Sequence, residues 1–180
     1  MANKKRARKA KPRSPVITIP SMSNQESDRL LRTILWDFFS ISNHMGRIRT
    51  YWASLTGITG PQWNILMAVD HLDKGVGVPV GEIANKLHVK STFVTAQSKL
   101  MEKTGHLRRI QSKSDRRVVL LSLTPATITR LNGFHKNRQR VNGMVFGEFS
   151  AQEFRYLVEQ MEGIRFRVER ALALLKSEIN

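Results

Sequence analysis

The amino-acid sequence predicts a mainly α fold with a small β-wing, in which a compact centre lies between long N- and C-terminal helices. Apolar residues recur every three or four positions in two long segments, 25–56 and 125–180, which is the period of an amphipathic helix. Between them, in 57–124, two short helical patterns are followed by two strand-like runs rich in β-branched and apolar residues. We therefore expect a single domain over 25–180.

The composition excludes several classes of protein. The 180 residues, 41% of them apolar, suffice for one domain with a core, and no stretch approaches the roughly 18 uninterrupted apolar residues of a membrane span. The absence of cysteine excludes disulfides, thiol nucleophiles and thiolate metal sites. We therefore expect a soluble, cytoplasmic protein that does not bind membranes.

The net charge of +16 is concentrated in two short segments. Residues 1–13 contribute +7, because they hold seven Lys or Arg and no acid, and residues 86–117 contribute another +7. A basic tail and one basic block inside the fold are expected of a protein that binds a polyanion. A basic surface that only keeps the protein in solution is the alternative.

The N-terminal part is predicted to be an arm followed by two helices. Residues 1–24 are rich in Lys and Arg and then in Pro and Ser, so we expect a disordered basic arm. A long helix follows with apolar positions from Leu30 to Leu55, and Pro61 suits the first turn of a second helix that ends near Asp73. The Gly-Val-Gly stretch after it lacks the GxGxxG spacing of nucleotide-binding loops, and we interpret it as a loop with one short strand.

The basic block inside the fold lies in a winged helix-turn-helix pattern. Residues 80–87 form a short helical pattern, and after a tight turn a second helix is predicted over 91–105. Residues 106–112 and 118–124 are strand-like, and the polar residues between them form the tip of a charged hairpin. A charged hairpin beside a helix-turn-helix is a wing, and such a fold binds DNA with its second helix in the major groove.

Two further helices are expected at the C-terminal end. A Thr-Pro pair at 124–125 starts a helix whose apolar positions continue to Val145, and a capping box from Ser150 to Glu153 starts the last helix. The last helix carries an apolar stripe over about twenty residues, which suits packing against another long helix. The long helices at both ends of the chain are therefore predicted to act mainly as dimerisation helices.

The surface predicted to face DNA is the side of the second helix that points away from the expected core residues Val94, Leu100 and Met101, together with the wing tip. Hydroxyl groups there are suited to base edges and lysines to phosphates, while arginine on a narrow extension fits the negative potential of a minor groove. An aspartate in the wing is able to hold one guanidinium in place. The alternatives are an ordinary solvated helix face and a flexible hairpin tip. The candidate DNA-binding residues are Lys90, Ser91, Thr92, Thr95, Ala96, Lys99, Lys113, Asp115, Arg116 and Arg117.

The stretch from Val80 to Thr124 resembles the winged-helix core of the multiple antibiotic resistance regulator (MarR) family. It has a threonine in the second helix, Thr95, a Met-Glu-Lys-Thr-Gly exit, an acid two residues before the wing arginine Arg117, and a closing Leu-Thr. The order of helices outside this core also matches. The resemblance therefore covers roughly residues 28–178.

The resemblance implies a transcriptional regulator that binds a pseudo-palindromic operator in double-stranded DNA as a homodimer, with repression relieved by a small ligand. Three features depart from the family pattern. Gln97 and Ser98 stand where the family usually places apolar residues, which makes the packing of this helix the first feature to inspect in a structure. A Pro-Ala-Thr run replaces a glycine that often follows the Leu-Thr, and the basic arm is an addition.

An effector site is implied by the resemblance where the first two helices meet the winged helix. An arginine or histidine beside aromatic rings is able to hold an aromatic carboxylate, so the hypothesis is an aromatic acid or its thioester. The alternative is that the two tryptophans are core residues and the histidine is an ordinary polar residue. The candidate effector-binding residues are His44, Arg47, Arg49, Tyr51, Trp52 and Trp63.

Two other functions are compared with specific regulation. A ligand-independent architectural protein would bind DNA by charge alone, with a steep salt dependence and little preference among sequences. An enzyme is not expected, because HExxH, GxSxG and P-loop motifs are absent and the five histidines fall on separate predicted elements. We accordingly predict no catalytic residue, no metal site and no cofactor.

Overall fold

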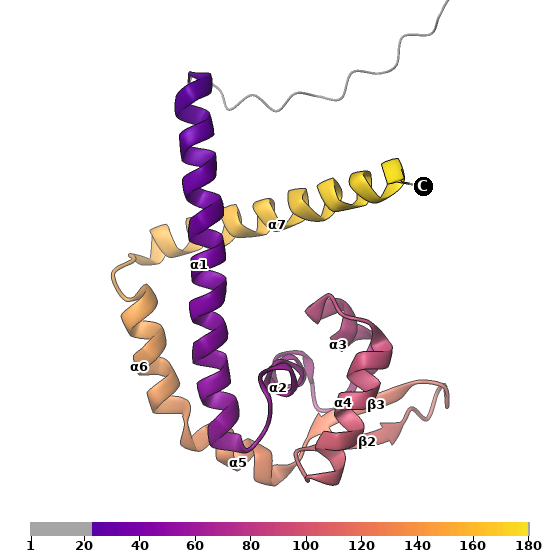
Figure 1. Cartoon of the computed structure of the whole chain (residues 1–180). Coiled ribbons are helices and arrows are strands. Elements are labelled where there is room, and N and C mark those ends of the chain that lie inside the picture. Colours follow the sequence, from indigo (N-terminus) through magenta and orange to yellow (C-terminus); the bar gives the residue numbers. More distant parts are fainter. Residues whose placement is uncertain (1–22, 180) are drawn as a thin grey trace, which may run out of the picture.

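The computed structural model describes residues 23–179, so residues 1–22 of the predicted basic arm lie outside the described residues. The described part is mainly α-helical with a small antiparallel sheet, which confirms the predicted fold class. In chain order the elements are α1 (Asn24–Thr56), α2 (Gly60–Leu72), β1 (Val78–Pro79), α3 (Val80–Leu87), α4 (Ser91–Lys103), β2 (Leu107–Gln111), β3 (Val119–Leu123), α5 (Pro125–Gly133), α6 (His135–Phe146) and α7 (Ala151–Ile179) (Figure 1).

Helix α1 has 33 residues and forms a long column beside the other elements (Figure 1). The Oγ of Ser23 caps its first turn by accepting a hydrogen bond from the N–H of Glu26 at 3.3 Å. The helix ends at Gly57, whose φ of 73° is the left-handed conformation that glycine adopts without strain. It begins at Asn24, so the helix includes the last residue of the predicted arm.

Helices α2, α3 and α4 pack on a three-stranded antiparallel sheet in the order β1-β3-β2. We call residues 57–124 the head. The register pairs Arg109 of β2 with Leu121 of β3, and Val78 of β1 pairs with Leu121 from the other side. Every one of these elements contributes to the apolar core, whose most deeply buried side chains include Ile65, Leu66, Ile83, Val94, Met101, Leu107 and Leu121.

One backbone carbonyl ties the end of α1 to both the head and α5. The carbonyl oxygen of Thr56 accepts hydrogen bonds from Nε2 of His106 and from Nη1 of Arg130, each at 3.1 Å. Thr56 is buried, His106 immediately precedes β2, and Arg130 belongs to α5. Because segments far apart in the sequence share this acceptor, the junction orients the head relative to the long helices.

The single helix predicted from Pro125 onward is wrong, because the structure divides it at Phe134 into α5 and α6. The ring of Phe134 packs against the buried Trp52, with ring centroids 6.2 Å apart. The preceding residue, Gly133, has a low helix propensity, which makes an interruption here less costly. The apolar period continues through the break, so periodicity alone does not detect it.

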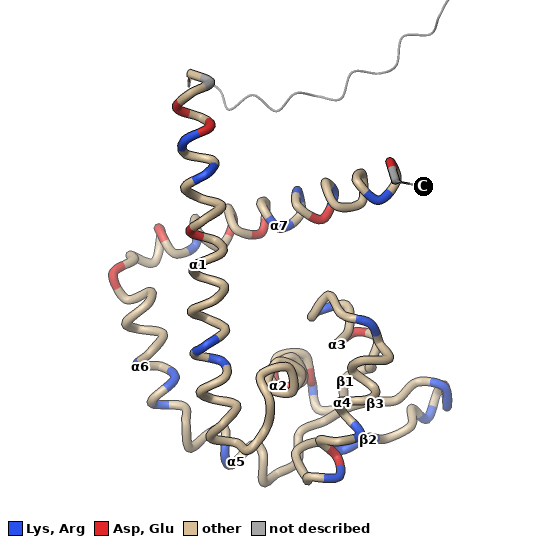
Figure 2. Tube along the Cα trace, in the orientation of Figure 1, with Lys and Arg blue, Asp and Glu red and all other residues tan. Residues whose placement is uncertain are grey.

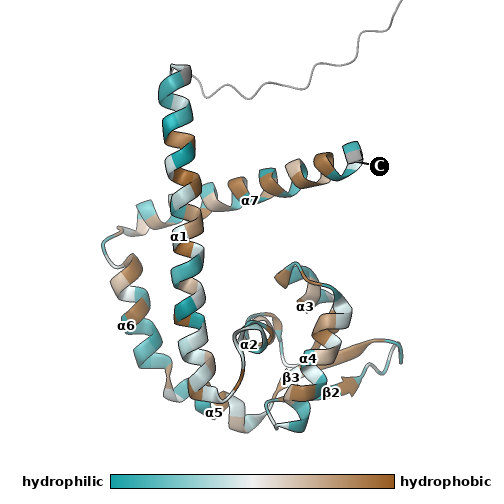
Figure 3. Ribbon diagram, viewed as in Figure 1, coloured by the Kyte–Doolittle hydropathy of each residue, from teal (hydrophilic) through white to brown (hydrophobic). Residues whose placement is uncertain are grey.

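The long helices leave large apolar surfaces uncovered in the single chain. Hydrophobic bands run along α1 and α7 (Figure 3), where Leu35 is 64% exposed and Leu172 is 51% exposed. Apolar surface on this scale is characteristic of an interaction site rather than of a solvated helix. Other exposed apolar residues on α1, α6 and α7 include Leu31, Ile34, Trp36, Phe39, Met144, Phe166, Val168 and Leu175.

Candidate nucleic-acid interface

Helix α4 turns one face to the core of the head and the opposite face to solvent. The buried face consists of Val94, Ser98 and Met101, which are four and three residues apart and so lie on one side of the helix. Among the candidate residues on or just before this helix, Thr95 is half-buried, and the exposed ones are Lys90, Ser91, Thr92, Ala96 and Lys99.

Two apolar side chains of α4 differ from the expectation for this helix. Leu100, which the sequence interpretation directed toward the core, is 50% exposed because the buried face runs through Ser98 instead. Phe93 was not singled out from the sequence, yet it is 37% exposed beside Thr92. An apolar group at this position is chemically suited to contact a thymine methyl group. The exposure of Phe93 follows from the rotation of α4 about its own axis, which the sequence alone does not give.

Gln97 and Ser98, where apolar residues were anticipated, are held by polar partners. The Nε2 of Gln62 on α2 donates a hydrogen bond to Oε1 of Gln97 at 3.1 Å. The Oγ of Ser98 accepts from Nη1 of Arg109 on β2 and donates to the carbonyl of Thr95 at 3.2 Å. Because a buried polar group without a partner is costly, these bonds make the two residues compatible with a packed helix.

Arg109 is an internal residue of the head although it belongs to the basic block of 86–117. Its side chain is 11% exposed, and its Nε lies 3.5 Å from Oε2 of Glu102 on α4. The neighbouring Arg108 points to the opposite side of β2 and is exposed, as the alternation of a strand requires. One of the nine cations of the basic block therefore stabilises the fold and is not presented to a ligand.

The tip of the wing is a tight turn that carries exposed cations. The N–H of Val118 donates to the carbonyl of Asp115 at 2.9 Å, which closes the turn between β2 and β3. The Oδ1 of Asp115 accepts from the backbone N–H of Arg117 at 2.9 Å and from its Nε at 3.4 Å. The Arg117 side chain is 93% exposed, and Lys113 and Arg116 are exposed beside it. Figure 2 shows the basic residues gathered at this end of the hairpin.

A groove of about 580 Å³ between α1 and α2 contains two of the candidate effector residues, Arg47 and Arg49. The Nη1 of Arg49 donates a hydrogen bond to Oδ1 of Asn64 at 3.3 Å across the groove. Two cations beside a concave surface are able to hold an anionic group. The other lining residues are Asn43, Gly46, Thr50, Gly60, Pro61 and Asn64.

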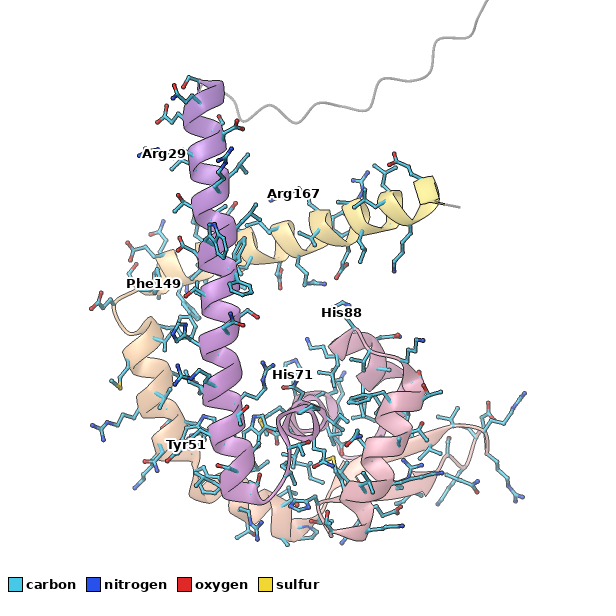
Figure 4. The ribbon with its side chains drawn as sticks, viewed as in Figure 1. Arg29, Tyr51, His71, His88, Phe149 and Arg167 are labelled. Atoms are coloured by element: carbon cyan, nitrogen blue, oxygen red, sulfur yellow. The ribbon has the colours of Figure 1, made fainter. Side chains whose placement is uncertain are left out.

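The other four candidate effector residues lie outside this groove. Trp52 and Trp63 belong to the core, with 7% and 5% of their surface exposed. On the exposed surface of α1, His44 donates from Nδ1 to the carbonyl of Ser40 at 2.8 Å. The ring of Tyr51 contacts that of Trp52, with centroids 5.1 Å apart, on the side of α1 nearest α6 (Figure 4). The structure therefore does not bring the six candidates into one pocket.

Among residues 23–179, no three His, Asp or Glu side chains come together in a group able to hold a metal ion. None of the helices in the same range is both long enough and apolar enough to cross a membrane.

The head corresponds to the defining region of a known family. The sequence profile of the MarR family matches residues 58–119, from the loop before α2 to the first residue of β3. The head is thus similar to the winged-helix region of the MarR family. The resemblance noted in the sequence is thereby confirmed, and members of this family are transcriptional regulators rather than enzymes.

Two curated relatives are similar to this chain over part of their length. The uncharacterized HTH-type transcriptional regulator YdgJ of Bacillus subtilis (strain 168) is 26% identical over 110 residues, which are 61% of this chain and 65% of YdgJ. The transcriptional activatory protein BadR of Rhodopseudomonas palustris (strain ATCC BAA-98 / CGA009) is 26% identical over 95 residues, 53% of this chain and 54% of BadR. The matched region thus spans less than two thirds of either relative.

The likeness among solved structures extends beyond the head. A putative MarR family transcriptional regulator from Listeria monocytogenes, crystallised with 26mer DNA, superposes with a TM-score of 0.66 at 15% sequence identity. The superposition covers 79% of this chain and 93% of that protein. Because the superposed part of the chain is much longer than the head, the long helices also share the fold of that protein.

Proposed function

We propose that this chain is a sequence-specific, DNA-binding transcriptional regulator. The observation that carries the proposal is the pairing of two surfaces, the solvent face of α4 with Thr92, Ala96 and Lys99, and the wing tip with Arg116 and Arg117. An exposed helix beside a basic hairpin suits simultaneous contact with a major groove and its neighbouring backbone or minor groove. The Listeria protein of the same fold was crystallised with DNA.

The chemistry of the candidate residues suggests a division of work on the duplex. The hydroxyls of Ser91, Thr92 and Thr95 and the methyl of Ala96 are suited to base edges. The cations Lys90, Lys99 and Lys113 are suited to phosphates, which position the protein without reading sequence. In the wing, Asp115 orients Arg117 for a minor groove beside Arg116. The basic arm is proposed to add phosphate contacts.

We propose a homodimer formed mainly by the segments 25–56 and 125–180, with the head as its DNA-binding region. The exposed apolar bands of α1, α6 and α7 support it, because a second copy would remove them from water. Two-fold symmetry would present two α4 helices to successive major grooves of a pseudo-palindromic operator. In light scattering coupled to size exclusion, Leu172→Glu should yield a monomer, whereas Gln160→Glu, an exposed polar position on the same helix, should not.

Repression relieved by an aromatic carboxylate or its thioester is the proposed mode of regulation. The groove beside Arg47 and Arg49 is the favoured place for the carboxylate, whereas Trp52 and Trp63 are buried in the core and do not line it. Calorimetric titration with a panel of aromatic acids tests this proposal, and Arg47→Ala with Arg49→Ala should abolish any heat of binding. Uniform absence of heat for the unchanged protein would refute this effector class.

The decisive experiment for DNA recognition is selection of bound fragments from genomic DNA, followed by footprinting of the best fragment. A protected inverted repeat supports specific regulation in the cytoplasm, where the chromosome lies. Binding without a protected repeat, at an affinity that depends on salt alone, would instead indicate an architectural protein. A reporter gene behind the selected site distinguishes repression from the activation for which BadR is named.

A further inference from the structure

The side-chain amide of Gln62 serves two helices at once. Its Oε1 accepts a hydrogen bond from the N–H of Thr59 at 3.1 Å, which completes the capping box at the start of α2. Its Nε2 donates to Oε1 of Gln97 on α4 at 3.1 Å. The amide oxygen and nitrogen are therefore both committed, so Gln62 connects the first turn of α2 directly to α4.

The position of Gln97 on α4 makes this contact sensitive to the placement of that helix. The buried face of α4 runs through Val94 and Ser98, and its exposed face carries Thr92 and Lys99, while Gln97 is half-buried at the side facing α2. A small rotation or shift of α4 about its axis would move Gln97 out of hydrogen-bond range. A half-buried amide that loses its partner also loses stability, which opposes that movement.

The same first turn of α2 forms one wall of the groove against α1. Gly60, Pro61 and Asn64 line the groove, and Asn64 accepts the hydrogen bond from Arg49 of α1 at 3.3 Å. The approach is close, since a Cβ at Gly60 would lie 3.4 Å from Oγ1 of Thr50. Proline at the helix start and the capping box make the turn rigid, so Asn64 and Gln62 move together.

We propose that Gln62 is a positioning residue that transmits the spacing of α1 and α2 to the DNA-facing helix α4 through Gln97. On one side of α2, the Arg49–Asn64 hydrogen bond spans the groove, and on the other side Gln62 is hydrogen-bonded to α4. A ligand that displaces Arg49 from Asn64 would thereby alter the orientation of α4. The inference rests on the proposed function only for its consequence on DNA, because the mechanical link concerns the free protein.

The link is tested first without DNA, by hydrogen exchange of the backbone amides of α4. Gln97→Ala leaves the α2 cap intact and should increase exchange in α4 about three- to tenfold, the change expected when one hydrogen bond is lost. Gln62→Ala should increase exchange in α4 by a similar factor, and the double variant should exchange no faster than either single variant. Gln62→Glu should resemble the unchanged protein, because its carboxylate still accepts from Thr59 and from the Gln97 amide after a flip. Gln139→Ala, at an exposed glutamine on α6, is the matched control.

The transmission step is tested by combining Arg49→Ala with Gln97→Ala. Arg49→Ala alone should change exchange in α4, and it should have no further effect once Gln97 is alanine. Effects that simply add, or an Arg49→Ala variant with unchanged α4, would overturn the proposal.

The same variants are then compared for affinity to the selected operator and to random DNA. The ratio of the two affinities should fall about three- to tenfold in Gln97→Ala, with random-DNA binding unchanged. If the effects of Arg49→Ala and Gln97→Ala on exchange in α4 are coupled but the unchanged protein binds all DNA sequences equally, the proposal of specific regulation is refuted and the link through Gln62 is supported. If the unchanged protein prefers the operator but the effects of the two substitutions on exchange simply add, only the link through Gln62 is refuted.

Discussion

The guanidinium of Arg109 on β2 donates a hydrogen bond to the Oγ of Ser98, at the centre of the buried face of α4. The same guanidinium lies 3.5 Å from the carboxylate of Glu102 one turn further along α4. Ser98 completes its bonding by donating to the carbonyl of Thr95 at 3.2 Å. A single side chain of the sheet thus fixes the DNA-facing helix at two points.

Arg109→Ala should destabilise the protein by about 1–3 kcal/mol, since it leaves the Ser98 hydroxyl in the core without its donor. The free energy of unfolding from urea denaturation is the appropriate measurement. Arg108→Ala, the exposed neighbour on the other side of β2, is the control and should change stability by less than about 0.5 kcal/mol. Equal effects of the two substitutions would show that Arg109 contributes only general charge.

These polar contacts mark the boundary of what the sequence could predict about α4. The existence of the helix followed from local signals, hydroxyl residues suited to a cap at Ser91 and Thr92 and a stop at Gly105, which can be read along the chain. The expected cap is wrong, because the N-cap residue is Lys90 and no side chain caps the helix there. The partners of Gln97 and Ser98 are Gln62 and Arg109, which belong to other elements. Their contacts exist only after folding, so the sequence could identify the unusual residues but not how they are satisfied.

The prediction that Leu100 faces the core was wrong for the same reason. Its hydrophobicity suggested the core, but the phase of α4 is set by Val94 and Met101, and that phase buries the polar Ser98 instead. Similarly, the break at Phe134 depends on the ring of Trp52, a contact between distant parts of the chain. The aromatic residues proposed for an effector were also ambiguous, because a tryptophan suits a core and a ligand pocket equally well.

The carboxylate of Glu153 provides a titration probe for the start of α7. The hydroxyl of Ser150 donates a hydrogen bond to it and the backbone N–H of Ser150 donates another at 2.8 Å, and in that order they hold the pKa of Glu153 below its usual range. A carboxyl whose pKa is lowered by folding adds stability above its unfolded pKa and loses that contribution as pH falls through the folded pKa. Ser150→Ala should therefore raise the pKa of Glu153, as followed by NMR of the carboxyl carbon. Ser177→Ala, near the other end of α7, should leave it unchanged.

Lys99 stands on the exposed face of α4, where a phosphate contact is proposed. Lys99→Ala should weaken binding to the selected operator and to random DNA by the same factor, because a phosphate contact carries no sequence information. The slope of log affinity against log salt concentration should become shallower by about 1. Lys136→Ala on α6 removes the same charge outside the head and should leave the slope unchanged. A selective loss of operator binding in Lys99→Ala would instead assign this residue to base recognition.

The aspartate of the wing offers a test in which two physical effects have opposite signs. Asp115 accepts two hydrogen bonds from Arg117, whose side chain is 93% exposed and makes no other hydrogen bond or ion pair with residues 23–179. If preorganisation dominates, Asp115→Ala should weaken operator binding by about 0.5–1.5 kcal/mol, because the freed arginine must be ordered on the DNA. If repulsion between a carboxylate and phosphates dominates, the same substitution should strengthen binding. We expect weakening, measured by fluorescence anisotropy, with Asp115→Asn intermediate because its amide oxygen still accepts from the backbone.

In an Arg117→Ala background, itself weaker by about 1–3 kcal/mol, Asp115→Ala should cause no further loss. Tighter binding by Asp115→Ala would contradict the role assigned to this pair.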